Sequence, residues 1–136
     1  MKIAQLMTKS VQTINGESLV SEAITLLADR HLSALPVVDH GGRLIGVISA
    51  SDILRNEAES ATPEEREELF RETLVREIMT AKPSVIAPRA TAREAAQQML
   101  YQEIHRLYVV DEGKLVGVIS QSDLVRDVAT AREPVT

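Results

Sequence analysis

The sequence lacks cysteine altogether, and aromatic residues make up only 2% of its 136 residues. The absence of cysteine excludes disulfides, thiolate chemistry and cysteine-based zinc sites. Because aromatic side chains are so scarce, we expect a core of Val, Ile, Leu, Ala and Met. No apolar run is long enough to span a membrane, and no charged segment followed by an apolar one opens the chain, so we expect a soluble, cytoplasmic protein.

Basic residues are outnumbered by acidic ones, and the acidic excess is local. The formal net charge is −5, and residues 56–77 contain eight acids and three bases. No basic patch stands out, so nucleic-acid binding is not expected. Within the acidic stretch, Thr62, Pro63 and Glu65 have the types of an N-cap, a first-turn proline and a capping-box partner. They predict a solvated connecting helix that runs towards Arg76, not a second domain.

An internal repeat is the most informative feature that the sequence does contain. Residues 7–55 reappear as residues 79–126, with one glycine fewer in a turn. The copies share Met-Thr at the start, Val-Val-Asp in the middle and Gly-Val-Ile-Ser-x-Ser-Asp at the end. A long period with two copies indicates two like units that fold against each other, not a solenoid. A cleft between such units is where a ligand site is expected.

Each copy predicts a strand, a helix, a glycine-containing β-hairpin and a second helix. Ser18 is the expected N-cap of the first helix in copy one, and a box of Thr91 and Glu94 in copy two. The expected first strands are residues 11–14 and 84–87, the hairpin strands 34–38 with 44–48 and 107–110 with 115–119, and the second helices begin at 51–52 and 122–123. The apolar faces of the first helices are expected at Leu19, Ala23, Ile24 and Leu27, and at Ala92, Ala95, Ala96, Met99 and Leu100.

The Ser-x-Ser-Asp array at the end of each copy is the strongest chemical signal. It lies where a strand ends and a helix begins, so unpaired helix N–H groups and serine hydroxyls converge on one spot that favours an anion. The aspartate cannot help to bind a phosphate, but it can accept both hydrogen bonds from a ribose diol. Serine and aspartate together therefore indicate a nucleotide. The competing interpretation is that Ser51 or Asp52 only caps the helix.

These features resemble a pair of cystathionine-beta-synthase (CBS) domains, the tandem called a Bateman module. The resemblance covers residues 3–128 and rests on the Met-Thr pairs, on Ser-Ala-Leu-Pro-Val-Val-Asp from Ser33 to Asp39, and on Gly-h-x-Ser-x-x-Asp in both copies. It implies an α+β fold of two βαββα repeats packed about a pseudo-twofold axis, with sheets inside and helices outside. Two clefts between the repeats would bind AMP, ADP, ATP or S-adenosylmethionine.

The resemblance also implies which residues bind the ligand. Asp52 and Asp123 would bind ribose. The residues expected near phosphate are Ser33, Ser49, Ser51, His105, Arg106, Ser120 and Ser122, with Ala34 at the position that corresponds to Arg106. The pair at His105 and Arg106 is also similar to the nucleotide-binding repeats of the gamma subunit of AMP-activated protein kinase.

The two copies differ in ways that predict unequal sites. Copy two has His105 and Arg106 where copy one has Ser33 and Ala34, and a planar guanidinium suits phosphate. Because clefts in the family draw on both repeats, Arg106 is a candidate for the cleft whose aspartate is Asp52. The competing interpretation of Arg106 is an exposed arginine at a strand end.

Catalytic and metal-binding functions are not expected. The histidines lack ligand spacing, no nucleophile is paired with a base, and no phosphate loop of the Gly-x-x-x-x-Gly-Lys type occurs. Met7 and Met79 are expected in the core.

We expect a stand-alone homodimeric regulatory module that is not an enzyme, needs no obligatory cofactor, and signals in trans to another protein. The alternatives are a ligand-independent dimerisation scaffold and an S-adenosylmethionine sensor. The expected organisation is repeat one at 1–58, an acidic linker at 59–76, repeat two at 77–129 and a tail at 130–136.

Overall fold

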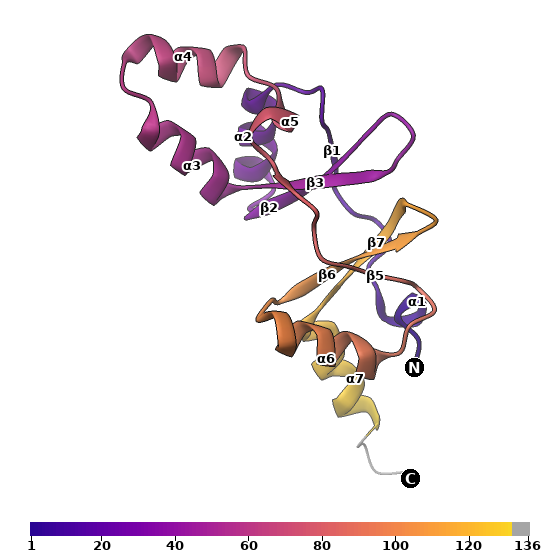
Figure 1. The fold of residues 1–136 in the computed structure, drawn as a ribbon. Coiled ribbons are helices and arrows are strands. Elements are labelled where there is room, and N and C mark those ends of the chain that lie inside the picture. Colours follow the sequence, from indigo (N-terminus) through magenta and orange to yellow (C-terminus); the bar gives the residue numbers. More distant parts are fainter. Residues whose placement is uncertain (132–136) are drawn as a thin grey trace. The chain divides into compact units, whose positions relative to one another are not determined.

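The computed structural model describes residues 1–131 (Figure 1). The chain divides into two compact units, which we name by the repeat that each contains. The first-repeat unit consists of Gln12–Pro83. The second-repeat unit consists of Met1–Val11 together with the chain from Ser84 onward.

The first-repeat unit is a four-stranded mixed sheet with helices. Its elements are β1 (Ile14–Asn15), α2 (Val20–Asp29), β2 (Ala34–Val38), β3 (Leu44–Ser49), α3 (Ala50–Glu59), α4 (Pro63–Arg71), α5 (Val75–Ile78) and β4 (Thr80–Ala81). The strand order is β1-β2-β3-β4, with β1 parallel to β2 and the other pairs antiparallel. The central order of β1, α2, β2, β3 and α3 confirms the predicted βαββα repeat.

The second-repeat unit has the same plan. Its elements are α1 (Ile3–Leu6), β5 (Val85–Ile86), α6 (Ala92–Gln102), β6 (Arg106–Asp111), β7 (Lys114–Ser120) and α7 (Gln121–Ala131). The strand order is β5-β6-β7, with β5 parallel to β6 and β7 antiparallel to it. The α+β fold of two βαββα repeats is therefore confirmed.

Alternating strand residues place the core on the helix side of each sheet. In the first-repeat unit, Leu35 and Ile48 are fully buried and directly paired. In the second-repeat unit the equivalent pair is Leu107 and Ile119, packed with Met99 of α6. Because side chains alternate along a strand, the residues next to these point to the other face of the sheet. The candidate site lies where these strands end.

The segment ahead of each repeat packs on the sheet of the other repeat. Thr8 forms two backbone hydrogen bonds with Val118 of β7, both 2.9–3.0 Å long, and Met7 packs against the second-repeat core. In the first-repeat unit β4 pairs with β3, and Met79 packs against the first-repeat core. Both methionines therefore lie in a core as predicted. The compact units differ from the expected sequence ranges because these short segments complete the sheets.

Some local predictions were wrong. The strand predicted at 11–14 begins only at Ile14, and Leu19, not Ser18, is the N-cap position of α2. The Ser18 carbonyl instead accepts a hydrogen bond from Val75. Leu100, predicted to face the core, is 74% exposed. The acidic helix ends at Arg71, well before the predicted end.

Other local predictions are confirmed. The Thr62 and Thr91 hydroxyls cap α4 and α6 by accepting hydrogen bonds from the backbone N–H groups three residues later. Helix α4 has no buried residue, as expected for a solvated connector. Within residues 1–131, no helix is long and apolar enough to cross a membrane.

Candidate functional site

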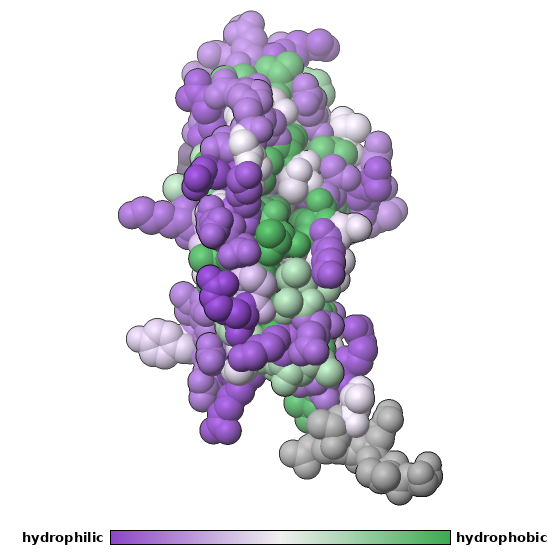
Figure 2. Space-filling model, turned by 90° about the vertical axis from the view of Figure 1, so that its right-hand side faces the viewer, coloured by the Kyte–Doolittle hydropathy of each residue, from purple (hydrophilic) through white to green (hydrophobic). Residues whose placement is uncertain are grey.

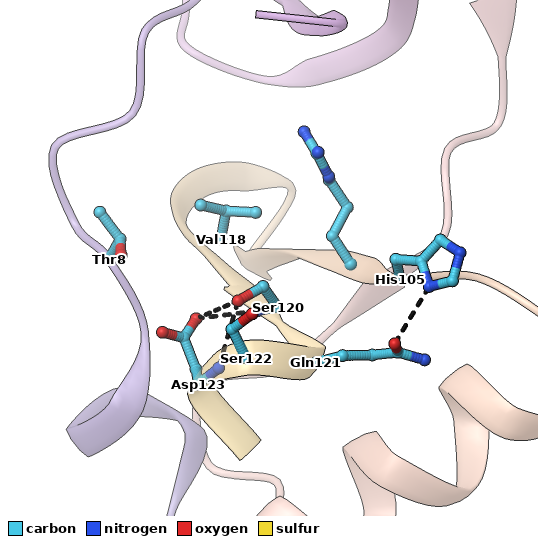
Figure 3. A pocket seen from close by; sticks show the side chains of 8 residues that line it. Thr8, His105, Val118, Ser120, Gln121, Ser122 and Asp123 are labelled. Atoms are coloured by element: carbon cyan, nitrogen blue, oxygen red, sulfur yellow. Dashed lines mark hydrogen bonds between the residues drawn. The ribbon is translucent and has the colours of Figure 1, made fainter. Parts of the chain in front are cut away.

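A pocket of about 470 Å³ lies in the second-repeat unit, where β7 ends and α7 begins (Figure 3). Its volume falls in the range of small-molecule sites. The pocket is lined by Thr8, His105, Arg106, Val118, Ser120, Gln121, Ser122 and Asp123. The start of β6 supplies the histidine and the arginine, because Arg106 is directly paired with Ser120 across the sheet.

Ser120 and Asp123 form a reciprocal cap at the start of α7. The Asp123 backbone N–H donates to the Ser120 Oγ at 3.2 Å, and the Ser120 N–H donates to the Asp123 Oδ2 at 2.9 Å. The Ser120 hydroxyl also donates to Oδ2, at 3.0 Å (Figure 3). The capping interpretation of the array is therefore correct as far as Oδ2 is concerned. It leaves the second carboxylate oxygen for another role.

The other oxygen of Asp123 has an exposed arginine as its partner. Arg126 Nη1 lies 3.3 Å from the Asp123 Oδ1, and the arginine side chain is 72% exposed. An exposed ion pair of this kind contributes little stability, because water around the guanidinium weakens its attraction to the carboxylate. A ribose hydroxyl can therefore take this oxygen at small cost.

The equivalent aspartate of the first-repeat unit is held more tightly. Asp52 and Ser49 form the same reciprocal cap, with distances of 2.9 and 3.1 Å. In addition, the Thr80 hydroxyl donates to the Asp52 Oδ1 at 3.1 Å, and Arg55 lies 3.3 Å from the same oxygen. The Asp52 side chain is 5% exposed, against 13% for Asp123. The Thr80 hydroxyl is an additional partner of the Asp52 Oδ1, and the side chain is more buried, so the two aspartates are not equivalent.

Arg106 keeps its positive charge available to a ligand. It shares one face of β6 with Tyr108, which is buried. Burial raises the pKa of Tyr108 above its ordinary value of 10.0, and the nearby Arg106 offsets part of that rise. The phenol is therefore neutral at physiological pH, and no phenolate competes for the guanidinium.

His105 is held by the first residue of α7. Its Nδ1 lies 3.0 Å from the Gln121 Oε1, and the Gln121 backbone N–H donates to the His105 carbonyl at 2.9 Å. The histidine thus has a defined position at the rim of the pocket (Figure 3). Among residues 1–131, no cluster of three or more His, Asp or Glu side chains is placed to hold a metal ion.

Comparison with known proteins identifies the repeat. The CBS domain family model matches residues 3–59 and 75–130. The chain belongs to the CBS domain family. A CBS domain-containing protein of Dictyostelium discoideum is 34% identical over 137 residues, which cover 98% of this chain and 94% of the relative. The chloroplastic CBSX1 of Arabidopsis thaliana is 28% identical over 147 residues, and the match spans 91% of this chain but only 62% of CBSX1.

Solved structures of CBS proteins share the fold over nearly the whole chain. The crystal structure of CBSX2 in complex with AMP has a TM-score of 0.79 and 26% identity, and the match covers 97% of this chain and 98% of CBSX2. A Methanocaldococcus jannaschii protein described as a candidate archaeal homologue of the gamma subunit of AMP-activated protein kinase has a TM-score of 0.76 at 21% identity. This second likeness is one of fold. It covers 93% of this chain and 47% of that protein.

The CBS repeats bring together the residues predicted within each copy. All five predicted residues of copy two line the pocket described above: His105, Arg106, Ser120, Ser122 and Asp123. Those of copy one lie at the equivalent end of β2 and β3 and in the first turn of α3: Ser33, Ala34, Ser49, Ser51 and Asp52. Their roles towards a ligand stay predictions. Arg106 lines the pocket of Asp123, and its predicted pairing with the cleft of Asp52 stays a prediction.

Three residues of this CBS pocket were not among the predicted site residues. Thr8 lies on the segment ahead of the first repeat, and this segment pairs with β7 at Val118, so both residues line the pocket. The repeated Met-Thr pair was the available signal for Thr8. Gln121 fills the variable position of Ser-x-Ser-Asp, where copy one has alanine, so a motif-based prediction passes over it.

Proposed function

We propose that this CBS pair is a non-catalytic regulatory module that binds an adenine nucleotide, AMP, ADP or ATP, and transmits its occupancy to another protein. The observation that carries the proposal is the second-repeat pocket, where Arg106, two serine hydroxyls and an aspartate with one loosely held oxygen line the same space. The AMP complex of the structurally similar CBSX2 supports an adenine nucleotide as the ligand.

The chemistry of the pocket suits the two polar parts of a nucleotide. Arg106 has five N–H donors in a planar fork that matches phosphate oxygens. The exposed Ser122 hydroxyl in the first turn of α7 adds a donor where the helix N-terminus favours negative charge. Asp123, on the same turn, accepts hydrogen bonds from the ribose diol through Oδ1. Phosphate and ribose are thereby bound by different side chains of one helix turn and one strand.

The differences between the Asp52 and Asp123 sites predict that the two repeats bind a nucleotide with unequal affinity. In the first-repeat unit a ribose must displace Thr80 or Arg55 from the Asp52 Oδ1, and Ala34 replaces Arg106. Each difference weakens nucleotide binding. We therefore expect the second-repeat pocket to be the tighter site.

The test of the proposal compares AMP with adenosine in the variant Arg106→Ala. Calorimetric titration of the intact protein is expected to show a loss of roughly 10- to 100-fold in AMP affinity, because a charge-assisted hydrogen bond contributes about 1.5–3 kcal/mol. Adenosine affinity is expected to change little. Saturating AMP is also expected to raise the melting temperature of the unmodified protein by mass action.

Arg93→Ala is the matched control, because Arg93 is exposed on α6 and does not line the pocket. Equal losses for AMP and adenosine would show that Arg106 acts through packing. If neither AMP, ADP nor ATP binds or raises the melting temperature at millimolar concentration, the scaffold alternative is the better one. Binding of S-adenosylmethionine alone would favour the sensor alternative.

We further propose that the module forms a homodimer through α6 and α7. Apolar side chains reach the surface among polar ones (Figure 2), and on these two helices Leu100, Tyr101 and Val125 are 74%, 91% and 67% exposed. A groove of about 300 Å³ lies beside them. It is lined by Ala96, Met99, Leu100, Gln121, Leu124, Val125 and Val128, none of which is charged. Two copies related by a twofold axis can therefore pack this face against itself without like-charge repulsion.

The first-repeat unit has an additional helix beside the equivalent face, although Leu54 on that face stays 65% exposed. Helix α4 contacts both α2 and α3 there, which are the counterparts of α6 and α7. On the second helices of the two repeats, Leu54 and Val125 are exposed, whereas Ile53 packs against its own core and Leu124 is buried. The second-repeat face is therefore the one that we expect a second copy to cover.

Val125→Glu is accordingly expected to convert the dimer to a monomer at micromolar concentration, as measured by analytical ultracentrifugation. A charge at the centre of an apolar interface loses its hydration, which disfavours association. Leu54→Glu is the matched control in the first-repeat unit and is expected to leave the dimer intact. A monomeric mass for the unmodified protein would contradict the dimer, and dissociation by Leu54→Glu alone would place the interface elsewhere.

A further inference from the structure

The contact between His105 and Gln121 distinguishes the second-repeat pocket from its counterpart. The two copies share one backbone hydrogen bond at this point: Gln121 N–H donates to His105 O, and Ala50 N–H donates to Ser33 O, both at 2.9 Å. The side chains differ completely. Copy one has a serine and an alanine here, whereas copy two has an imidazole and an amide in contact.

The orientation of the Gln121 amide follows from its second neighbour. Its Nε2 lies 3.4 Å from the Ile104 carbonyl oxygen, which can only accept a hydrogen bond. The amide nitrogen must therefore face Ile104, and the amide oxygen must face the His105 Nδ1, at 3.0 Å. Because Oε1 can only accept, the hydrogen lies on Nδ1. The neutral ring then has its lone pair on Nε2.

This tautomer determines what His105 offers to an anion. Solvated neutral histidine favours hydrogen on Nε2, and the identity of the protonated nitrogen is set by the partner of the other one. Among residues 1–131, no hydrogen bond engages the His105 Nε2. The neutral ring therefore has an acceptor at Nε2, and an acceptor cannot bind a phosphate oxygen. The protonated ring presents an N–H donor at the same atom while keeping its bond to Gln121.

We propose that Gln121 is a positioning residue that fixes His105 as the Nδ1–H tautomer, so that His105 binds the phosphate of a nucleotide only after taking up a proton. The inference rests on the proposed nucleotide function. The other charged groups at this end of the unit are Arg106 on β6, Asp123 on α7 and Glu103 at the C-cap of α6. Within residues 1–131, none of them forms a hydrogen bond or ion pair with the ring, so the hydrogen bond from Nδ1 decides its tautomer.

The first test requires no ligand. Nitrogen-15 NMR of the His105 ring in the unmodified protein, at a pH where the ring is neutral, is expected to show hydrogen on Nδ1. In Gln121→Ala, which introduces the residue of copy one, the ring is expected to revert mainly to the Nε2–H form. Gln97→Ala, an exposed glutamine on α6, is the control and should leave the tautomer unchanged. An Nε2–H ring in the unmodified protein would overturn the assignment.

The second test measures AMP and adenosine affinity at pH 6 and pH 8. The AMP affinity at pH 6 divided by that at pH 8 is expected to be about three- to tenfold smaller in Gln121→Ala than in the unmodified protein. This factor corresponds to one modest hydrogen bond. His105→Ala should give the same reduced ratio, and adenosine should show no such change. Titration of the phosphate itself is common to all variants and cancels. AMP binding with an unchanged ratio would overturn only this inference, whereas absence of AMP binding would overturn the proposed function with it.

Discussion

Replacing Asp52 with alanine is expected to lower the free energy of unfolding by roughly 2–4 kcal/mol, about twice the loss of about 1–2 kcal/mol expected for Asp123→Ala. Both variants lose a reciprocal helix cap with a serine. Asp52→Ala also removes the hydrogen-bond partner of the Thr80 hydroxyl, and the carboxylate that it removes is the more buried one. Although Thr80 is itself exposed, its hydrogen bond is made to a carboxylate that is only 5% exposed, so its loss costs more than the loss of a surface contact.

Denaturant unfolding of the two variants measures this difference. Thr80→Val removes only the long-range hydrogen bond, and in combination with Asp52→Ala it forms a double-mutant cycle. We expect a coupling energy of about 1 kcal/mol between these residues. Equal losses for the two aspartate variants, or no coupling with Thr80, would contradict the structural difference between the repeats.

The aspartates therefore have a structural role in addition to their proposed role in ribose binding. A binding loss in an alanine variant mixes the two effects, because the cap orders the same helix turn that contacts the ligand. Asp123→Asn is the better variant for binding, since the amide preserves the shape of the side chain. Its effect on AMP affinity should be read beside its effect on stability.

Gly46→Ala and Gly117→Ala are each expected to destabilise the protein by roughly 1–3 kcal/mol, the usual cost of overpacking. A Cβ at Gly46 would lie 2.5 Å from the Met79 Sδ and 2.9 Å from the Thr80 carbonyl oxygen. A Cβ at Gly117 would lie 2.7 Å from the Met7 Sδ and 2.9 Å from the carbonyl oxygen of the next residue, Thr8. The sulfur can move, but the carbonyl belongs to the backbone that pairs with the strand.

Thermal unfolding of both variants tests this prediction, with Gly41→Ala as the control. At Gly41 the nearest atom to an added Cβ is a side-chain oxygen of Asp39 at 3.4 Å, so little change is expected. Adding Met7→Ala to Gly117→Ala should not restore stability, because the clash with the Thr8 carbonyl remains. Full rescue by Met7→Ala would show that the clash with the Met7 side chain, and not with the Thr8 carbonyl, excludes a Cβ at Gly117. Unchanged stability of both glycine variants would contradict the close approach.

The repeated glycine thus has a tertiary function that the motif alone does not reveal. In each unit it admits a Met-Thr segment that belongs, by sequence, to the other repeat. The serine and aspartate that follow it form the helix cap. One repeated motif therefore supports the close approach of a segment, the start of a helix and the proposed ligand site.

Several features could be predicted from the sequence because their signals are local. Nearly continuous apolar runs define β2, β3, β6 and β7, and the threonines three residues before glutamates define the starts of α4 and α6. The duplication located Ser120, Ser122 and Asp123, since strand end and helix start adjoin in the chain, whereas His105 and Arg106 were expected from the family resemblance. A helical period was less reliable where a residue such as Leu100 lies at the edge of the apolar face.

By itself, the sequence determined that the chain contains two βαββα repeats and that serine and aspartate stand at the start of each second helix. Only the tertiary structure decided that Met7 and Met79 pack on the opposite repeat's sheet, that Thr80 occupies an oxygen of Asp52, and that Gln121 holds His105. These contacts join residues that are distant along the chain. Side-chain periodicity and caps reflect near neighbours, so they carry no information about which distant partner a side chain finally contacts.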